Sequence, residues 1–361
     1  MGFRVAIVGA PGLLTSALVG MLDRRNFPID DLQLFAEKPD CVNAVFRDHP
    51  LIAQPLPRSV FNGFDITFMF ASSALSTRLI EEMTGSDCFV IDNSAYARAR
   101  RDIPLIVPEV NPAALEGTNI AANPTCTSIQ LAAVLKPLDR AARVSRAIVT
   151  TYQAVSGNGA QGVAALQAQV CAAVADEPIS PAFYPDGIAF NVIPHVGDFY
   201  DNGNTTEETN MEIETARLLD SDIRISATCV RVPVKRAHSQ AVHFETQSYL
   251  SVDKVHELLG ATPGIRIKDS KEPGGYPMPS TATGEDLIFV GRIRRSTVAE
   301  NGLLLWSVMD QIYKGSVLNA VQIAELIAYP KTTERLHHGA GVGQPNSIQT
   351  VKTCHFCGKS S

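Results

Sequence analysis

Short apolar runs alternate with helical stretches through the first third of this 361-residue chain. The runs are at residues 3–8, 32–36, 65–70 and 88–91, and the helical stretches are at residues 13–25 and 76–84. Strands separated by helices connect through right-handed crossovers, so they pair in a parallel sheet with helices on both faces. The pattern predicts an α/β fold with a Rossmann-type doubly wound parallel sheet, which would bind ligands at the carboxyl ends of its strands.

A different pattern begins near residue 125, where longer helices and strands mix as in an α+β domain. Its elements are expected at residues 128–138, 146–151, 162–176, 224–234 and 240–250. Because 361 residues are many for one hydrophobic core, we expect two domains, at residues 1–126 and 127–314. An apolar helix at about 315–330 would complete the first domain, and the polar residues 331–361 would form a flexible tail.

The composition argues against several kinds of partner. A net charge of −6 without a basic cluster argues against a nucleic acid, because binding its phosphates needs a basic face. No apolar run reaches the roughly 18 residues that span a bilayer, so no membrane partner is expected. The seven cysteines are odd in number and scattered, which is typical of reduced thiols in a cytoplasmic protein.

A glycine-bearing turn joins the first strand to the first helix, and its residues are Gly9, Pro11, Gly12 and Leu13. A dinucleotide pyrophosphate at this place would meet backbone N–H groups and the positive end of the helix dipole. The pattern is incomplete, since Thr15 stands where a third glycine is expected and Pro11 removes one N–H donor. A nucleotide site and a tight turn without a ligand both remain open.

Glu37 follows the second predicted strand, roughly 20 residues beyond the glycine turn. An acidic side chain there hydrogen-bonds the adenosine ribose hydroxyls of NAD, and it would repel the 2′-phosphate of NADP. The alternative is a solvated loop carboxylate beside Lys38, and the two interpretations have equal standing.

Cys126 lies immediately before the helix expected at residues 128–138. The dipole and free N–H groups at a helix start lower the pKa of a thiol and favour the thiolate, which can attack an acyl carbon. A structural cysteine is the alternative, so neighbouring segments have to decide. Segment 151–159 contains Gln153, and segment 229–239 carries Arg231 and His238; together they would supply an anion anchor and an acid–base group. Taken singly, Arg231 is equally a surface cation and His238 a strand-end histidine.

These segments resemble aspartate-semialdehyde dehydrogenases. AANPTCTSIQ (121–130) resembles the family's nucleophile segment, TYQAVSGNG (151–159) its acyl-orienting glutamine loop, and CVRVPVKRAHSQ (229–240) its arginine and histidine strand. Further similar segments follow in order: VIDNS (90–94), PLIVPEVNP (104–112), AFNVIPHV (189–196), TTEETNMEIET (205–215), FVGRIRRS (289–296) and KGSVLNAVQIAE (314–325). The resemblance extends from residue 3 to about residue 328.

The resemblance implies an oxidoreductase of amino-acid biosynthesis that uses NAD or NADP. The Cys126 thiolate would displace phosphate from aspartyl 4-phosphate, and the thioester would be reduced to the semialdehyde, with His238 as general acid and base. Residues 1–126 would bind the dinucleotide, and residues 127–314 would bind substrate and form a homodimer or homotetramer. The further implied roles are acyl orientation by Gln153, binding of the substrate carboxylate by Arg231 and of its ammonium by Glu207, phosphate contacts from Arg98 and Asn93, and a place near the nicotinamide for Asn319.

Several positions depart from the family pattern. Glu37 and Pro39 replace contacts to a 2′-phosphate, which favours NAD over NADP, and Asn210 replaces a phosphate-binding lysine. Ala95 replaces a serine, while Arg100 or Arg101 is either a substitute for that lysine or an exposed loop cation. A paralogous reductase of another acyl phosphate or acyl thioester is therefore an alternative. A non-catalytic binding protein of the same fold is a second alternative.

Cys354 and Cys357 have the two-residue spacing of half a zinc site, in the sequence CHFC near the end of the chain. His337 and His338 do not complete a standard zinc-finger spacing with them. A disordered tail without metal is the favoured interpretation, and no metal site is expected.

Overall fold

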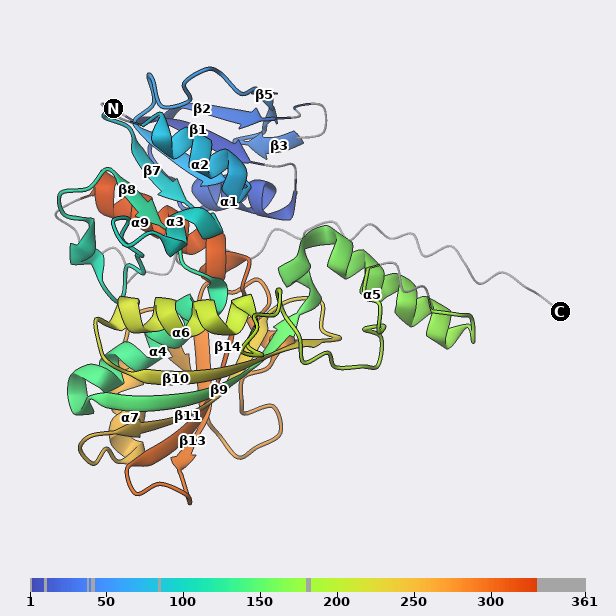
Figure 1. Ribbon diagram of the computed structural model, residues 1–361, viewed down its shortest axis with the longest axis vertical. Helices are drawn as coiled ribbons and strands as arrows, with labels where there is room; N and C mark the ends of the chain where they lie inside the picture. Colours follow the sequence, from blue (N-terminus) through green and yellow to red (C-terminus); the bar gives the residue numbers. More distant parts are fainter. Residues whose placement is uncertain are drawn as a thin grey trace.

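The computed structural model describes residues 2–9, 12–37, 39, 43–83, 86–179 and 183–329. The first domain is built on one sheet of parallel strands in the order β5-β2-β1-β6-β7-β8 (Figure 1). The strands are β1 (Phe3–Gly9), β2 (Ile29–Ala36), β5 (Gln54–Pro55), β6 (Ile66–Phe70), β7 (Phe89–Asp92) and β8 (Ile120–Ala122). The predicted Rossmann-type sheet is confirmed.

Helices and one hairpin surround this sheet. They are α1 (Leu13–Arg24), α2 (Ser73–Glu81), α3 (Ala95–Ala99), α9 (Leu318–Ala328) and the hairpin of β3 (Asn43–Phe46) with β4 (His49–Ile52). Residues Val5 to Val8 of the central strand are fully buried, as a strand covered on both faces requires. Val321 of α9 lies in the same hydrophobic core as Ile7 and Leu18, so the last described helix packs on the first domain.

The second domain is a mixed sheet in the order β10-β9-β11-β14-β13-β12. Its strands are β9 (Val144–Ala154), β10 (Arg224–Val232), β11 (His238–Thr246), β12 (Ile265–Ile267), β13 (Ile288–Arg295) and β14 (Gly302–Met309). Its helices are α4 (Cys126–Ala142), α5 (Gly159–Val174), α6 (Thr206–Leu219), α7 (Val252–Gly260) and α8 (Pro279–Ala282). The domain is α+β, as predicted.

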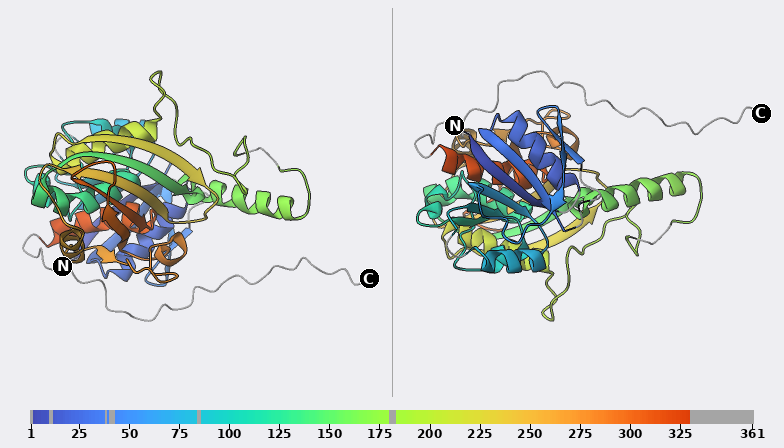
Figure 2. Two further views of the ribbon diagram at one scale, coloured as in Figure 1. Left: turned by 90° about the horizontal axis from the view of Figure 1, so that it is seen from below. Right: turned by 90° about the horizontal axis from the view of Figure 1, so that it is seen from above.

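The two faces of the second sheet differ in their cover. Helices α4, α6 and α7 pack on one face, over buried side chains such as Val149 and Phe244. The opposite face carries Ile148, which is 57% exposed, and Tyr152, which is 37% exposed. Helix α5 projects away from the body of the molecule in both views of Figure 2. Helix α8 covers part of this face, where Ala282 packs with Val308. Alternation along β9 leaves Ile148 and Tyr152 partly exposed on the same face.

Three local expectations were wrong. Cys126 is the first residue of α4 rather than a residue before it, and Gln153 lies on β9 rather than in a loop. No helix was expected at residues 206–219, where α6 starts with a capping box between Thr205 and Glu208. Strand β9 and helix α4 are longer than predicted because tertiary packing extends elements beyond their most apolar residues.

A π-helical turn, Tyr313–Val317, leads from β14 back to the first domain. Lys314 in this turn is 1% exposed, and its Nζ lies 2.7 Å from Glu109 Oε1 and 2.7 Å from Gln322 Oε1. This buried ion pair joins the turn to a segment of the first domain and to α9. Within the described ranges, no helix is both long and apolar enough to cross a membrane.

Candidate active site

A cavity of about 200 Å³ lies where the two domains meet, and Cys126 lines it. Its walls come from the start of α1, the ends of β7 and β9, α6 and the π-helical turn. The lining residues are Leu13, Leu14, Asn93, Arg98, Pro124, Thr125, Cys126, Ser156, Gly157, Gly159, Glu207, Gln311, Ile312, Gly315 and Ser316. The N-termini of α1 and α4 thus open onto one pocket, which is where a parallel sheet is expected to bind ligands.

Gly315 allows the π-helical turn to approach the cysteine. A Cβ atom at Gly315 would lie 2.8 Å from Cys126 Cβ and 2.8 Å from Met309 Cε, closer than carbon atoms can pack. The turn therefore closes one side of the pocket directly against the thiol.

Burial, followed by the nearby Glu207 carboxylate, raises the pKa of the Cys126 thiol to about 12, while Arg231 acts in the opposite direction. The expectation that the helix start would favour the thiolate is therefore wrong for the ligand-free pocket. The physical reason is desolvation, which penalises the charged form more than the helix N–H groups stabilise it. The resting group is a neutral thiol.

His238 faces the same region from the start of β11 and is 1% exposed. Its Nδ1 accepts a hydrogen bond of 3.1 Å from the Ala154 N–H, so the neutral ring carries its proton on Nε2. Among the described residues, Nε2 has no hydrogen-bond partner. Burial, followed by the charge of Arg231, holds the pKa of His238 well below its usual value. The ring is therefore a neutral donor that faces the site.

Gly157 brings the histidine and Arg231 to the edge of the cavity. A Cβ atom at Gly157 would lie 2.6 Å from Arg231 Nη1 and 3.4 Å from His238 Nε2. Arg231 is 5% exposed, and its Nη1 donates to the Ala154 carbonyl at 2.7 Å. Gly157 lines the cavity, and the Arg231 and His238 side chains lie directly behind it. Neither they nor Gln153 are among the described residues that line the cavity.

Gln153 and Glu207 are joined directly. Gln153 Nε2 donates to Glu207 Oε1 at 3.1 Å, and the Thr127 hydroxyl donates to the same oxygen at 2.9 Å. Glu207 therefore connects β9 with the first turn of α4. The sequence placed these groups in separate segments, and the structure brings them together.

Arg98 is held by a carboxylate that the sequence analysis missed. Its Nε lies 3.1 Å from Glu214 Oε1, and its Nη1 donates to the Asn93 carbonyl at 2.7 Å. Glu214 Oε2 also accepts hydrogen bonds of 2.8 Å from the Thr125 N–H and hydroxyl. Glu207 and Glu214 are seven residues apart on α6, so they share one face of the helix. Had this helix been recognised in the sequence, its period would have placed Glu214 beside Glu207.

Neither Asn210 nor Arg100 is among the described residues that line the pocket. Arg100 forms an ion pair with Asp102 and donates to the Tyr96 hydroxyl at 2.8 Å. Arg101 is exposed. The structure therefore favours the interpretation of Arg100 as a loop cation and leaves Arg98 as the cation at this end of the pocket.

The described part of the glycine turn fits a dinucleotide. A Cβ atom at Gly9 would lie 2.8 Å from Thr15 Oγ1, so β1 and α1 approach closely there. Among the described residues, no atom lies within 4 Å of where a Cβ at Gly12 would stand, so these residues leave the start of α1 open. Leu13 lies between this opening and the Cys126 pocket. Pro11 lies outside the described residues.

Glu37 follows β2 at a second hollow of about 470 Å³, which is also lined by Arg58, Arg78 and Glu82. Its carboxylate is 3.7 Å from Arg78 Nη2, and both side chains are more than half exposed. A weak surface ion pair leaves the carboxylate available to a ribose.

Asn319 lies behind the pocket rather than in its wall. It is fully buried, and its Nδ2 donates to the Ile106 carbonyl at 2.9 Å and to Asn123 Oδ1 at 2.7 Å. Within the described residues, no group of three or more His, Cys, Asp or Glu side chains is placed to hold a metal. Cys354 and Cys357 lie outside those residues.

The protein combines a Rossmann-type sheet with a second sheet domain, and Cys126 lines the cavity between them. This arrangement is that of a nicotinamide-dependent dehydrogenase with covalent cysteine chemistry. The family model "semialdehyde dehydrogenase, NAD binding domain" matches residues 4–118, and "semialdehyde dehydrogenase, dimerisation domain" matches residues 135–314. The chain belongs to the aspartate-semialdehyde dehydrogenase family.

Relatives and solved structures support this assignment. The aspartate-semialdehyde dehydrogenase of Aquifex aeolicus is 40% identical over 91% of this chain and 98% of its own length. That of Bacillus subtilis is 38% identical over 90% and 97%. The structure of aspartate semialdehyde dehydrogenase II from Vibrio cholerae matches with a TM-score of 0.87 and 36% identity, over 92% of this chain and all of the other.

In the ligand-free protein, we expect iodoacetamide to alkylate Cys126 slowly at neutral pH and steadily faster up to about pH 10, without a plateau. Because the pKa of the thiol is about 12, most of it stays protonated throughout this pH range, and only the thiolate reacts. Peptide mass spectrometry would follow the rate, and the Cys126→Ser variant would identify the peptide. A plateau near neutral pH would contradict the raised pKa.

Proposed function

We propose that this protein reduces aspartyl 4-phosphate to aspartate semialdehyde and phosphate, through a thioester on Cys126. The observation that carries the proposal is the meeting of the α1 and α4 N-termini at one pocket, with the cysteine on one helix and the open nucleotide turn beside the other. The nicotinamide, NAD or NADP, supplies the hydride when it is bound.

The chain's own groups support each bond change. Cys126 Sγ bonds the acyl carbon as the C–O bond to phosphate breaks, and the thiol proton leaves on the departing phosphate. After hydride addition, His238 Nε2–H donates a hydrogen bond to the oxygen of the tetrahedral adduct. The C–S bond then breaks to give the aldehyde and the Cys126 thiolate, which takes a proton from solvent to return the neutral thiol. Gln153 orients the acyl oxygen. Since the resting thiol is neutral, its proton leaves only when bound substrate changes the surrounding charge.

Charged side chains of this chain would bind both ends of the substrate. Arg231, deeply buried beside Gly157, binds the α-carboxylate with its planar guanidinium, and Glu207 binds the ammonium. Arg98 and Asn93 contact the phosphate from the first domain. A neighbouring structure, the Vibrio cholerae enzyme II, is described as complexed with ASA, which supports a substrate of this size.

One observation favours a second candidate function, the reduction of a different acyl donor such as an acyl thioester. Arg98 is paired with the 4%-exposed carboxylate of Glu214, and position 210 is an asparagine. The pair lowers the positive charge available to a dianionic phosphate. Transfer of an acyl group from another thioester to Cys126 needs no such charge.

For the cofactor, we propose that Glu37 favours NAD over NADP. A carboxylate at the end of β2 accepts hydrogen bonds from the ribose hydroxyls, while it repels a 2′-phosphate. Arg78, at 3.7 Å, offsets part of that repulsion. The preference is therefore one of degree.

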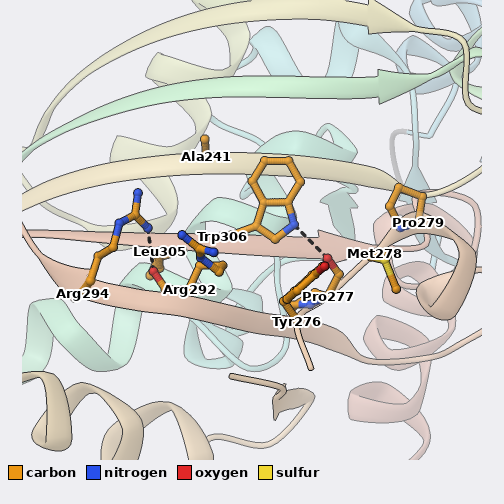
Figure 3. A pocket seen from close by; sticks show the side chains of 9 residues that line it. All are labelled: Ala241, Tyr276, Pro277, Met278, Pro279, Arg292, Arg294, Leu305 and Trp306. Carbon is orange, nitrogen blue, oxygen red and sulfur yellow. Dashed lines mark hydrogen bonds between the residues drawn. The ribbon is translucent and has the colours of Figure 1, made fainter. Parts of the chain in front are cut away.

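For the assembly, we propose a homodimer that pairs through the exposed part of the face of the second sheet that carries Ile148 and Tyr152. Figure 3 shows Trp306 on this face, with its indole N–H donating to the Pro277 carbonyl at 3.0 Å, between Arg292 on one side and Pro279 on the other. Its ring lies 5.3 Å from that of Tyr152. A hollow of about 380 Å³ beside it would receive side chains of the second copy. Aromatic and arginine side chains around an apolar face are typical of protein interfaces.

We expect Cys126→Ser to lower turnover by at least about 10³-fold, since the acyl group then has no nucleophile. The assay follows nicotinamide absorbance with L-aspartate semialdehyde, inorganic phosphate and NAD or NADP. Cys171→Ser is the matched control, because Cys171 is exposed on α5. Full activity of Cys126→Ser would refute the thioester, and wild-type inactivity with this substrate alone would favour the second candidate.

Glu37→Ser should raise kcat/KM with NADP relative to NAD by about threefold to tenfold, as expected for loss of one charge repulsion near the protein surface. Glu82→Ser is the control, because it removes a carboxylate from the same hollow. An unchanged cofactor ratio in Glu37→Ser, or an equal change in both variants, would contradict the role of Glu37.

Ile148→Arg should convert the homodimer to a monomer in light scattering after size-exclusion chromatography, because a charge would be buried at the interface. Ile52→Arg, at a residue 70% exposed on β4, should leave the dimer intact. A dimer that survives Ile148→Arg would place the interface elsewhere.

A further inference from the structure

Three asparagine side chains form a hydrogen-bonded row behind the pocket. Asn319 Nδ2 donates to Asn123 Oδ1 at 2.7 Å, and Asn123 Nδ2 donates to Asn93 Oδ1 at 2.8 Å. Asn319 and Asn123 are fully buried, while Asn93 lines the cavity. Asn93 and Asn123 directly follow β7 and β8, whose residues Asp92 and Ala122 are paired in register. The row therefore runs from α9, past two strand ends, to the pocket.

Two backbone carbonyls set the direction of every amide in this row. Asn319 also donates to the Ile106 carbonyl at 2.9 Å, and Asn123 to the Ser316 carbonyl at 3.1 Å. A carbonyl oxygen only accepts, so the amide end that faces it must be the NH₂ group. With both NH₂ groups of Asn319 and Asn123 so placed, the atom of Asn93 that faces Asn123 must be its oxygen.

The remaining end of Asn93 is consequently its NH₂ group. Within the described residues, Asn93 Nδ2 donates no hydrogen bond. The Asn93 carbonyl accepts from Arg98 Nη1 at 2.7 Å, which keeps the two residues together at the cavity wall. A donor and a guanidinium side by side suit an anion, whereas a rotated amide would present an oxygen and repel it.

We propose that Asn123 is a positioning residue that fixes Asn93 as a hydrogen-bond donor to the anionic group of the substrate. The proposal rests on the proposed function, since it names what orients one of the phosphate contacts. Asn123 does not line the cavity and acts through Asn93. Without it, the Asn93 amide loses the partner that selects its orientation, and its two rotamers become similar in energy.

Asn123 also donates to Ser316 in the π-helical turn, so a purely structural role has to be separated from the positioning role. A structural defect in that turn would change kcat and the KM of every substrate, because the turn contacts Cys126 through Gly315. The positioning role changes the KM of phosphate selectively. In a variant in which Asn93 has no amide, loss of Asn123 should have no further effect on the KM of phosphate.

The test is a double-mutant cycle of Asn123→Ala and Asn93→Ala, assayed with L-aspartate semialdehyde, varied phosphate and NAD or NADP. Each single variant should raise the KM of phosphate about tenfold, as for loss of a hydrogen bond to a charged group, with the KM of semialdehyde changed less than about twofold. The double variant should be no worse than Asn93→Ala. Additive effects, or equal changes in both KM values, would overturn the proposal.

A second measurement needs no turnover, and it has a substitute variant in case Asn123→Ala does not fold. Inorganic phosphate should protect Cys126 of the wild-type protein from iodoacetamide at about pH 9, and protection should need about tenfold more phosphate in Asn123→Ala. If that variant does not fold, Asn123→Asp keeps the size of the side chain, and by reversing Asn93 it should weaken protection at least as much. Unchanged protection in either folded variant would refute the positioning role. Wild-type protein that phosphate protects but that turns over no semialdehyde would count against the proposed function alone.

Discussion

The buried ion pair between Lys314 and Glu109 is the interaction on which the arrangement of the two domains depends. The chain builds the second sheet and then has to return to the first, and the π-helical turn makes that return with Lys314 as its second residue. Gln322 completes the site by accepting from Lys314 and donating to Glu109 at 3.0 Å. Because a buried charge without its partner is costly, the pair holds the turn in one position, and Gly315 is thereby held against Cys126.

Burial of the reactive groups determines the resting state of the pocket's chemistry. Burial raises the pKa of Cys126 and lowers that of His238, so both groups are neutral before substrate arrives. The ionic groups around them occur in opposite pairs, with Arg98 beside Glu214 and Glu207 near Arg231. A neutral thiol is protected from adventitious reaction, and its reactivity depends on what binds.

Much of the architecture was predictable because it follows local periodicity. Apolar runs of strand length separated by helices predicted the first sheet, and the family resemblance predicted which polar segments gather around Cys126. Glu214 and Asn123 were not recognised, because their importance comes from partners that are 89 and 30 residues away in the chain. The assignments of Asn319 and Glu37 to the cofactor remain predictions.

The sequence by itself determined four strands (β1, β2, β6 and β7) and two helices (α1 and α2) of the first domain, the place of Cys126 at the start of a helix, and the family to which the chain belongs. It did not predict β3, β4, β5, β8 or α3. Only the tertiary structure decided that this cysteine is a neutral thiol, that Glu214 pairs with Arg98, and that Asn319, Asn123 and Asn93 form one hydrogen-bonded row. Propensity and periodicity are properties of neighbouring residues. A pKa and the direction of an amide instead depend on desolvation and on backbone carbonyls that folding brings together from distant parts of the chain.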